Sequence, residues 1–269
     1  MSELSLEDDP LVGWIKGLES GFVNDRDALC IESFDGVALD ADRLAYFRCY
    51  LEKYYNERFI YGQGTEEILS NLRRYGASGH WLDLGSGTTT LFWSIPMEGL
   101  ASISCSDIVP EALAILDEFA RSAAVPPCYQ EVLGMYGKSP LDLALSRRLI
   151  KRFLVFDTLA PWPRWLSTEQ FDLITAFGNF GIAPTPGRYA ACFREIFRHL
   201  SPKGRALGAD WVRWPLFIEQ DGHDNSYLTP ALVDFVARQA GFAVLDCRQV
   251  PIKGDPQYQG VICWALERQ

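Results

Sequence analysis

The chain has 269 residues and a formal net charge of −10. Its length and its hydrophobic fraction of 48% are enough to bury one sizeable core, in one domain or in two. Aromatic residues make up 13% and charged residues 22%, which excludes a disordered chain. The lack of any run of about 18 apolar residues argues against a membrane span, and the negative charge balance argues against a nucleic-acid partner.

The start of the chain and the cysteines bear on where the protein works. The sequence begins MSELSLEDDP, and this acidic segment lacks the positive charge of a secretory signal. The seven cysteines are scattered, odd in number and without a CxxC pair, which is typical of reduced thiols and not of a disulfide framework or zinc site. We therefore expect a cytoplasmic protein without a metal.

Residues 1–75 are predicted to form an N-terminal helical cap or lid. The segment 11–23 suggests one short amphipathic helix. Between residues 42 and 74, apolar and aromatic residues recur at three- and four-residue steps, as they do on one face of a helix. Residues 76–269 are expected to form one compact domain.

Beyond residue 76, short apolar runs alternate with helical stretches, a pattern typical of a parallel, doubly wound sheet. The expected strands are 80–85, 101–107, 152–157, 171–177 and, after a turn at 201–204, 205–211. The expected helices are one from residue 89, then 110–123, 139–150 and 187–200. Residues 242–252 and 259–268 read as an antiparallel pair. The predicted fold class is α/β: a Rossmann-like, seven-stranded sheet with a C-terminal hairpin.

The sharpest motif is the turn DLGSGTT at residues 83–89, after a predicted strand and before a helix. Gly85 permits the tight turn, and Gly87 lets the backbone approach a ligand without a Cβ clash. The helix N-terminus that follows supplies N–H groups for a polar or anionic ligand group. Asp107 ends the next strand, where an acidic side chain can accept both hydroxyl groups of a ribose.

Two classes of nucleoside cofactor share this arrangement. A nicotinamide dinucleotide normally needs the full G-x-G-x-x-G motif for its pyrophosphate, whereas the sixth position here is Thr90. S-adenosylmethionine has no phosphate, so its site needs less glycine and more carboxylate, which Asp83 and Asp157 provide at strand ends. Ordinary turn chemistry is the alternative for each acid alone, but with Asp107 the three together favour a nucleoside site.

Three segments carry a family resemblance: YLEKYY at residues 50–55, GSGTT at 85–89, and the stretch 189–211 with LSPKG and Asp210. They resemble an N-terminal segment that folds over the cofactor, a GSGPT turn, and an LLKPGG segment with the strand after it. These belong to the class I methyltransferases of the nicotinamide, phenylethanolamine and indolethylamine N-methyltransferase family, which includes thioether S-methyltransferase. The resemblance runs from residue 45 to the C-terminus.

The resemblance implies roles for matching positions. Tyr50 and Tyr55 would contact the methionine end of the cofactor, while Tyr54 is expected to pack on the core. Asp107 would hold the ribose, and Asp157 with its neighbour would meet the adenine. The cofactor-binding residues that we expect are Tyr50, Tyr55, Asp83, Gly85, Ser86, Gly87, Asp107, Ile108, Asp157, Thr158 and Ala176.

The resemblance also implies that Asp210 faces the substrate nitrogen. A neutral amine or ring nitrogen becomes cationic as it attacks a methyl sulfonium, and a carboxylate beside it stabilises that charge and orients the nitrogen. Asp210 is therefore the expected catalytic residue; a solvated strand-end acid is the alternative. Trp211 and the residues after it could wall a flat aromatic pocket, or pack in the core. The substrate-binding residues that we expect are Asp210, Trp214, Phe217, Asn179 and Phe180.

The predicted function is an S-adenosylmethionine-dependent methyltransferase, most simply one that methylates nitrogen in an amine or heterocycle. Carbon, oxygen or sulfur acceptors are the alternative, with His223 as a base if the nucleophile is a hydroxyl or carbon acid. A binding module without turnover is a rival, because Ala112 and Leu91 replace an asparagine and an aromatic residue of the family. A nicotinamide oxidoreductase comes third. We expect a small-molecule partner, no nucleic acid, no membrane, and favour a monomer.

Overall fold

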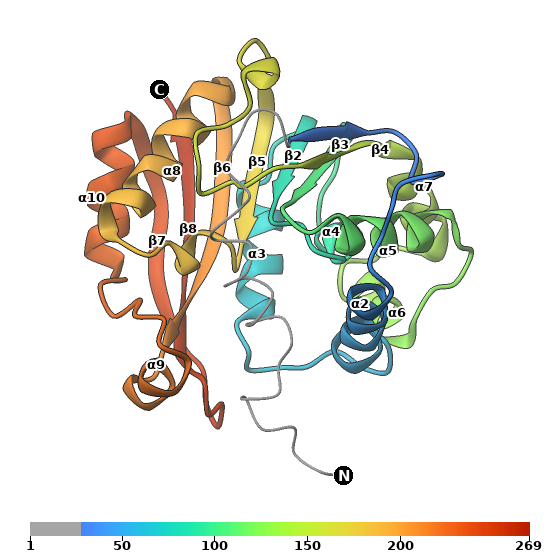
Figure 1. Ribbon diagram of the computed structural model, residues 1–269, viewed down its shortest axis with the longest axis horizontal. Coiled ribbons are helices and arrows are strands. Elements are labelled where there is room, and N and C mark those ends of the chain that lie inside the picture. Colours follow the sequence, from blue (N-terminus) through green and yellow to red (C-terminus); the bar gives the residue numbers. More distant parts are fainter. Residues whose placement is uncertain (1–27) are drawn as a thin grey trace.

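The computed structural model describes residues 28–269, which form a mixed α/β structure on a sheet of eight strands (Figure 1). The helix predicted at 11–23 lies outside the described residues. The strands are β1 (Leu29–Ile31), β2 (Gly79–Leu84), β3 (Leu100–Asp107), β4 (Ile150–Val155), β5 (Phe171–Phe177), β6 (Leu200–Arg213), β7 (Phe242–Pro251) and β8 (Tyr258–Arg268). Their order across the sheet is β1-β4-β3-β2-β5-β6-β8-β7.

Helices connect most of these strands. They are α2 (Ala41–Tyr55), α3 (Thr65–Tyr75), α4 (Thr90–Trp93), α5 (Pro110–Arg121), α6 (Pro127–Met135), α7 (Pro140–Leu149), α8 (Pro186–His199), α9 (Pro215–Asp221) and α10 (Pro230–Ala240), with 3-10 turns η2 (Arg164–Leu166) and η3 (Phe180–Ile182). A proline opens each helix from α5 to α10, at the position where its missing N–H is tolerated. Helices α6, α9 and α10 add to those predicted.

The pairing of the strands confirms the predicted fold class. Strands β4, β3, β2, β5 and β6 run parallel, β8 is antiparallel to β6, and β7 is antiparallel to β8. The sheet has one strand more than predicted, because β1 pairs antiparallel with β4 at the outer edge, with Leu29 opposite Val155. A strand of three residues is too short for an alternation of apolar and polar residues to reveal it in the sequence.

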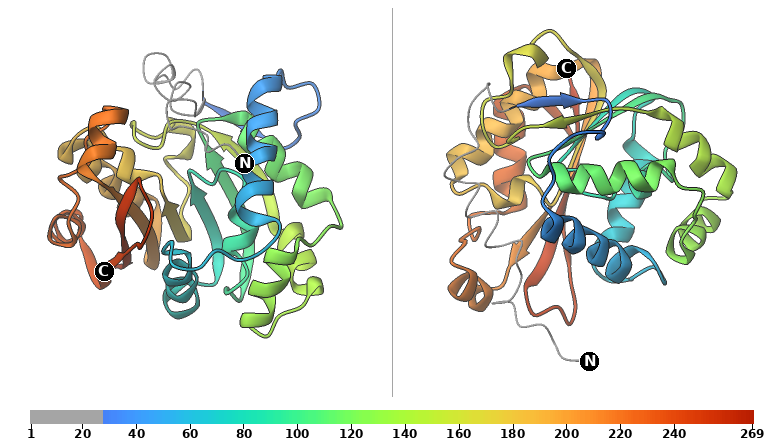
Figure 2. Two further views of the ribbon diagram at one scale, coloured as in Figure 1. Left: turned by 90° about the horizontal axis from the view of Figure 1, so that it is seen from below. Right: turned by 45° about the vertical axis from the view of Figure 1, so that its right-hand side comes forward.

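Helices cover both faces of the sheet (Figures 1 and 2). Helices α8 and α10 pack against β6 and β7, while α3, α5 and α7 pack on the other face, against β6, β8, β3 and β4. Helix α2 packs on α5. Figure 1 shows α2, α9 and the tip of the β7–β8 hairpin at the lower end of the molecule, toward which β6 runs.

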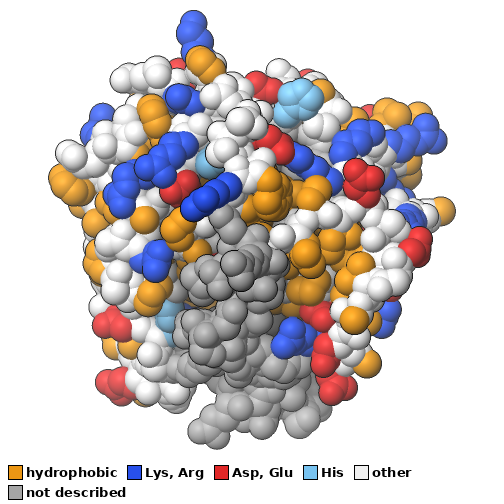
Figure 3. Space-filling model, turned by 45° about the horizontal axis from the view of Figure 1, so that its top comes forward, with side chains coloured by type: hydrophobic (Ala, Val, Ile, Leu, Met, Phe, Trp, Pro, Cys, Tyr) orange, Lys and Arg blue, Asp and Glu red, His pale blue; other side chains and the backbone are white. Residues whose placement is uncertain are grey.

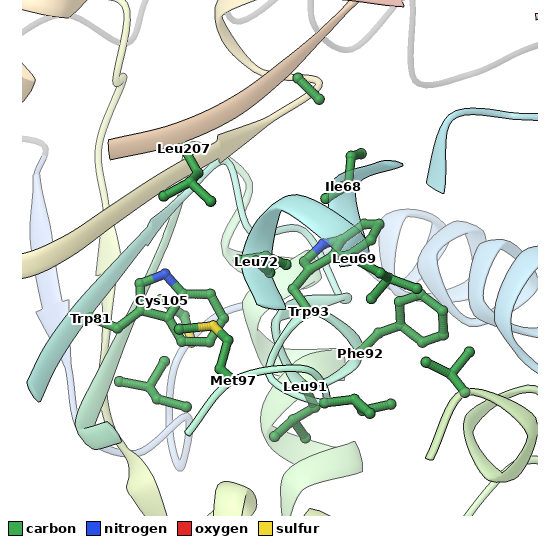
Figure 4. Close-up of a cluster of buried hydrophobic side chains, with 14 of the residues drawn as sticks. Ile68, Leu69, Leu72, Trp81, Leu91, Phe92, Trp93, Met97, Cys105 and Leu207 are labelled. Atoms are coloured by element: carbon green, nitrogen blue, oxygen red, sulfur yellow. The ribbon is translucent and has the colours of Figure 1, made fainter. Parts of the chain in front are cut away.

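Each central strand is buried on both faces, so its residues alternate between two core clusters. On β2, Trp81 enters the cluster of Figure 4 together with Leu72 of α3 and Leu207 of β6. Its neighbour Leu82 points the other way, into the cluster beneath α8. Successive side chains of a strand point to opposite faces, so two neighbouring residues of a central strand lie on opposite sides of this sheet.

The helical run predicted for residues 42–74 is divided in two. Helix α2 begins after Asp40, whose Oδ1 accepts the N–H of Asp42 at 2.9 Å, as an N-cap residue does. The loop to α3 contains Gly62 and Gly64, with φ angles of 80° and 85°. A right-handed helix cannot continue through positive φ angles, and the loop therefore separates α2 from the sheet-packed α3.

The turn expected at residues 201–204 is part of β6 instead. Phe171 pairs with Leu200, but the next pair joins Leu173 to Arg205, so the ladder contains an irregularity with extra residues on β6. Within it, Lys203 has a φ of 62°. In such an irregularity the extra residues are left unpaired and the ladder is locally interrupted, and the pairing of β6 with β5 resumes at Arg205.

Gly208 on β6 is a position where a side chain is expected to destabilise the fold. A Cβ there would lie 2.0–2.6 Å from three atoms of the Trp264 indole, and this ring is fully buried. We expect Gly208→Ala to lower the free energy of unfolding by about 1–3 kcal/mol, measured by chemical denaturation. Gly134→Ala, in α6 with no atom within 4 Å of its Cβ, should instead stabilise by about 0.5–1 kcal/mol. Equal effects of the two substitutions would contradict the tight contact at Gly208.

Candidate functional site

A cavity of about 690 Å³ lies at the carboxyl end of the parallel strands, beside α2. Its lining comes from the segments that follow β2 to β5, from the end of β6, from α2 with its following loop, and from the β7–β8 hairpin. The strand order reverses between β2 and β5, which is where open α/β sheets bind ligands. The volume is within the range of small-molecule sites.

The predicted glycine turn forms the floor of one end of this cavity. Gly85 and Gly87 have φ angles of 58° and 49°, a region that favours glycine. A Cβ on Gly85 would lie 2.7 Å from the side chain of Asn179, whereas one on Gly87 would meet no atom within 4 Å. Gly85 is thus required by packing, and Gly87 leaves open space in the cavity.

Asp107 is brought to the glycine turn by the pairing of β3 with β2. Its Oδ2 accepts the N–H of Gly87 and its Oδ1 the N–H of Val109, both at 2.9 Å. Burial raises the pKa of this carboxyl, and the N–H groups of Val109 and Gly87 act in the lowering direction. Each carboxylate oxygen has a further acceptor site, and the side chain lines the cavity, so it can accept hydroxyl groups of a ligand.

Two hydroxyl groups of the turn have no hydrogen-bond partner among the described residues. They are Ser86 Oγ and Thr88 Oγ1. Both atoms are buried, and both residues line the cavity. Buried polar atoms are rarely left unsatisfied. Their position next to Asp107 therefore indicates a ligand with polar groups at this end of the cavity.

The segments after β4 and β5 meet at the same end. Asp157 Oδ1 accepts the N–H of Leu159 at 2.8 Å, and Asn179 Nδ2 donates to Thr158 Oγ1 at 2.8 Å. All four residues line the cavity. The structure thus brings the predicted residues Asp157, Thr158 and Asn179 together with the glycine turn and with Ile108, which also lines the cavity.

Three tyrosines of α2 also line the cavity. The ring centroids of Tyr50 and Tyr55 are 5.9 Å apart, and the Tyr50 ring lies 5.0 Å from that of Tyr54. Burial raises the pKa of Tyr50 to about 12, against the lowering effect of a hydrogen bond from Tyr55, and it raises the pKa of Tyr55 well above its usual value. Tyr54 was expected to pack on the core, but it is 41% exposed and faces the cavity.

Asp83 supports the turn from below and is not among the described residues that line the cavity. Thr90 Oγ1 donates to its Oδ2 at 2.6 Å and Thr175 Oγ1 donates to its Oδ1 at 2.5 Å. Trp81 Nε1 in turn donates to Thr175 Oγ1 at 2.8 Å. This network fixes the end of β2. Asp83 therefore stabilises the strand end that carries the glycine turn and does not make the cofactor contact that was expected.

The buried carboxyl of Asp83 is expected to make stability fall as the pH rises from about 4 to 7. Burial raises its pKa from 3.8 to about 7, against hydrogen bonds from Thr175 and Thr90. In this window the folded state binds more protons than the unfolded state, so the free energy of unfolding decreases by up to about 1.4 kcal/mol per pH unit. Chemical denaturation across this range should show a flatter profile for Asp83→Asn; parallel profiles of variant and wild type would contradict the assignment.

Asp210 does not reach the cavity, which corrects its expected place as the substrate-facing catalytic residue. Its Oδ2 accepts the hydroxyl of Tyr189 at 2.6 Å and Nε1–H of Trp264 at 3.0 Å, and the residue is fully buried. Burial raises its pKa to about 6, against these two hydrogen bonds. The reason is strand alternation: the next residue, Trp211, lines the cavity, so Asp210 points to the opposite face, beneath α8.

Four further expected contacts also lie elsewhere. Ala176 and Phe180 have no exposed surface and belong to the core cluster beneath α8. Trp214 is 41% exposed and donates Nε1–H to the carbonyl of Asp255, while Phe217 is buried. None of the four is among the described residues that line the cavity. The same holds for His223.

The cavity is also lined by residues that the sequence did not single out. They include Phe177, Arg213, Asn225 and Tyr258, and the ring of Trp93 in α4 lies 5.2 Å from that of Phe177. Phe177 and Arg213 are the last residues of β5 and β6. Because ligands bind at the carboxyl ends of parallel strands, this position is the one sequence signal that could have identified them as lining residues. Asn225 and Tyr258 come from a loop and from the hairpin, and no local motif marks them.

Metal sites, disulfides and membrane spans were not expected from the sequence. Among residues 28–269, no group of three or more His, Cys, Asp or Glu side chains is arranged to hold a metal ion. All seven cysteines are free thiols. No helix in the described part of the chain has the length and apolar character to cross a membrane. On the face shown in Figure 3, Lys and Arg side chains are interspersed with acidic and apolar ones.

Comparison with known proteins gives relatives in structure only. No protein-family model matches the chain, and no curated protein matches its sequence. The N-methyltransferase NodS from Bradyrhizobium japonicum, solved with S-adenosyl-L-homocysteine, is 13% identical; the match covers 76% of this chain and 86% of NodS, with a TM-score of 0.50.

Two further structures are similar at comparable levels. A putative sarcosine dimethylglycine methyltransferase from Galdieria sulphuraria is 16% identical over 76% of this chain and 84% of its own, with a TM-score of 0.52. SpnF, described as a 4+2 cyclase, is 15% identical over 84% of this chain and 93% of its own, with a TM-score of 0.56. At these identities the likeness is one of fold, and the chain shares the Rossmann-like fold of these three proteins.

Proposed function

We propose that the protein is an S-adenosylmethionine-dependent methyltransferase that acts on a small molecule. The observation that carries the proposal is the Asp107 carboxylate, which is fixed by two backbone N–H groups and faces a cavity beside a glycine turn. An acid at this place in a doubly wound sheet accepts the hydroxyl groups of a ribose. NodS, which has the same fold, was solved with S-adenosyl-L-homocysteine, and this supports the cofactor class.

The residues present fit this cofactor better than a dinucleotide. The sixth position of the glycine motif is Thr90, whose hydroxyl is used to hold Asp83. Helix α4 after the turn has only four residues, so it offers little of the dipole and few of the N–H groups that a pyrophosphate needs. The unpartnered hydroxyls of Ser86 and Thr88 suit an uncharged nucleoside or an amino-acid group.

We infer the following division of the site. Asp107 and Ile108 hold the ribose, and Asp157 with Thr158 lies at the base. Tyr50 and Tyr55 line the part toward α2, where the sulfonium end of the cofactor would be held. Gly85, Ser86 and Gly87 form the floor beneath the ligand. These are the expected residues that line the cavity.

When bound, S-adenosylmethionine supplies an electrophilic methyl group on a sulfonium. The chain's residues need to supply position more than proton transfer, and alignment of two reactants contributes up to about 7–11 kcal/mol. The faces of Tyr50 and Tyr55 can attract a cation by about 0.5–2 kcal/mol. A phenol is already neutral near pH 7 at its usual pKa of about 10, and burial raises the pKa of both tyrosines further, so neither hydroxyl becomes a competing phenolate nucleophile.

Nitrogen of an amine or heterocycle is the acceptor that we propose first. This rests on the resemblance of YLEKYY and GSGTT to the nicotinamide, phenylethanolamine and indolethylamine N-methyltransferase family. Asp210 gives no support to the nitrogen assignment, because it lies on the other face of the sheet. Acceptors with a carbon, oxygen or sulfur nucleophile are the alternatives. The division at residue 75, the cytoplasmic location and the monomeric state stay predictions.

A protein that binds the cofactor without transferring its methyl group is the second candidate. SpnF, described as a cyclase, has this fold, so the fold alone does not require methyl transfer. Incubation with methyl-labelled S-adenosylmethionine and a panel of amines, heterocycles, phenols and thiols separates the two. We expect a labelled product whose mass and fragmentation give the methylated atom, and much less of it with Asp107→Ala at the same low cofactor concentration. Binding of S-adenosylhomocysteine without any labelled product would favour the second candidate.

A further inference from the structure

Helix α2, whose three tyrosines line the cavity, rests on a core cluster of its own. Phe47 of α2 is buried there together with Val109, Ala112 and Ile115, which lie just before and within α5. This cluster is separate from the two larger clusters on the faces of the sheet. The N-terminal half of α2 is therefore attached to the segment that begins α5.

A buried carboxylate also joins the start of α2 to the first turn of α5. Glu111 is 3% exposed, and its Oε1 accepts the N–H of Asp40, the N-cap residue of α2, at 2.9 Å. Its Oε2 lies 3.8 Å from Nη1 of Arg43, in the first turn of α2. A glutamate is almost never fully buried unless it is paired. Here the groups that pair with it belong to the N-terminal end of the tyrosine helix.

The segment that carries Glu111 also carries the acid that we assign to the ribose. Asp107 Oδ1 accepts the N–H of Val109 at 2.9 Å, and both Ile108 and Val109 line the cavity and contact the cluster under α2. The ribose and the sulfonium of S-adenosylmethionine are covalently joined. A ribose held by Asp107 therefore requires the wall around the sulfonium to stand at a matching distance, and one short segment can set both positions.

Tyr50 lies between this anchor and a second attachment at the other end of α2. There the ring of Tyr55 contacts Phe92, a member of a large core cluster, with centroids 5.1 Å apart. A helix of 15 residues is a stiff rod, so a displaced N-terminus turns it about Tyr55 and moves the ring of Tyr50. A misplacement of about 1 Å is enough to lose an aligned contact.

We propose that Glu111 is a positioning residue of the cofactor site, which holds the N-terminus of α2 so that the ring of Tyr50 faces the sulfonium. This inference rests on the proposed function, because it takes the part of the cavity between Asp107 and α2 as the cofactor site. Glu111 is not among the described residues that line the cavity. It therefore acts through Tyr50 and not through a contact with the ligand.

The test uses two ligands that differ in their charge at sulfur. Calorimetric titration of the full chain, without an acceptor, compares S-adenosylmethionine, a sulfonium cation, with S-adenosylhomocysteine, a neutral thioether. Glu111→Met keeps the length of the side chain but offers the N–H of Asp40 no oxygen. We expect it to lower the ratio of the affinity for S-adenosylmethionine to that for S-adenosylhomocysteine about fivefold, because the cation loses the face of Tyr50. Glu111→Gln keeps an acceptor and should retain most of the wild-type ratio.

Two further variants separate positioning from general damage to the fold. Glu118→Met removes another contact between α5 and α2, the exposed ion pair with Arg48 at 2.8 Å, and should leave the ratio unchanged, because exposed pairs contribute little. In the background of Tyr50→Leu, which removes the ring, Glu111→Met should change the ratio by less than about twofold. An unchanged ratio in Glu111→Met, an equal fall in Glu118→Met, or the full fall in the Tyr50→Leu background would overturn the proposal.

Hydrogen exchange of the backbone amides gives a readout that needs no ligand. In Glu111→Met the amides of α2 should exchange at least about tenfold faster than in the wild type, while those of α8 keep their rates. Unchanged exchange in α2 would also overturn the proposal. If neither ligand binds to the wild type, the proposed function fails, and the exchange rates still show whether Glu111 holds the helix.

A second pair of variants replaces Glu111→Met if that chain does not fold. Asp40→Pro removes the N–H that Glu111 accepts, and the φ of −78° at this position suits proline. Asp40→Ala, which loses only the side-chain cap, is its control. The ratio should fall about fivefold further in Asp40→Pro than in Asp40→Ala, and equal ratios in the two variants would overturn the proposal.

Discussion

Asp107→Ala is expected to weaken the binding of S-adenosylhomocysteine by about 100-fold. The carboxylate would accept hydroxyl groups of the ribose, and hydrogen bonds to a charged group contribute about 1.5–3 kcal/mol each. It also fixes the N–H groups of Gly87 and Val109, so its loss loosens the turn that forms the floor of the site. Isothermal titration calorimetry of the purified variant measures the effect directly.

A change of ligand separates the two contributions of Asp107. The 2′,3′-dideoxy analogue of S-adenosylhomocysteine lacks the hydroxyls that the carboxylate would accept, so wild type and Asp107→Ala should differ much less in their affinity for it. Asp234→Ala, on the surface of α10, is the control and should leave both affinities unchanged. An equal loss for the two ligands would show that Asp107 acts only on the turn, and an unchanged affinity would remove it from the site.

Asp210→Ala is expected to destabilise the fold by about 2–4 kcal/mol and to change the affinity for S-adenosylhomocysteine by less than about threefold. The substitution leaves the hydroxyl of Tyr189 and Nε1–H of Trp264 without their acceptor in the core. A buried donor without a partner costs about 1–3 kcal/mol. Chemical denaturation and calorimetry on the same preparation give both numbers.

The double variant Asp210→Ala, Tyr189→Phe tests the cause of this loss. Because Tyr189→Phe removes one of the two stranded donors, the double variant should be more stable than the sum of the single effects predicts. Strict additivity would mean that the hydrogen bond is not the source of the instability. A loss of methyl transfer in Asp210→Ala with normal stability and normal cofactor affinity would return Asp210 to the active site.

Much of the fold and half of the site followed from local patterns in the sequence. The alternation of apolar runs with helical stretches predicted the strands from β2 to β8 and the helices α4, α5, α7 and α8 between them, but not α6, α9 and α10. The glycine turn and Asp107 lie together because they follow or end two neighbouring strands, so their spacing along the chain was enough to predict that they meet. Sequence proximity does the same for Asp157 and Thr158 at the end of β4.

The features that were not predicted depend on information that the sequence pattern lacks. β6 is buried on both faces, so its apolar residues do not alternate with polar ones and cannot indicate that Asp210 faces away from the cavity. Arg213, Asn225 and Tyr258 meet only because the hairpin and a loop return to the end of β6. Trp264, which holds Asp210, is 54 residues away in the chain.

The most direct test of the account is a calorimetric titration of the wild-type chain with S-adenosylhomocysteine and, separately, with NADH. The account predicts micromolar binding of S-adenosylhomocysteine and no measurable binding of NADH, because the site has a ribose-binding acid and buried hydroxyls but no pyrophosphate-binding helix. Binding of NADH, or of neither compound, would contradict the assignment of the glycine-turn half of the cavity to S-adenosylmethionine.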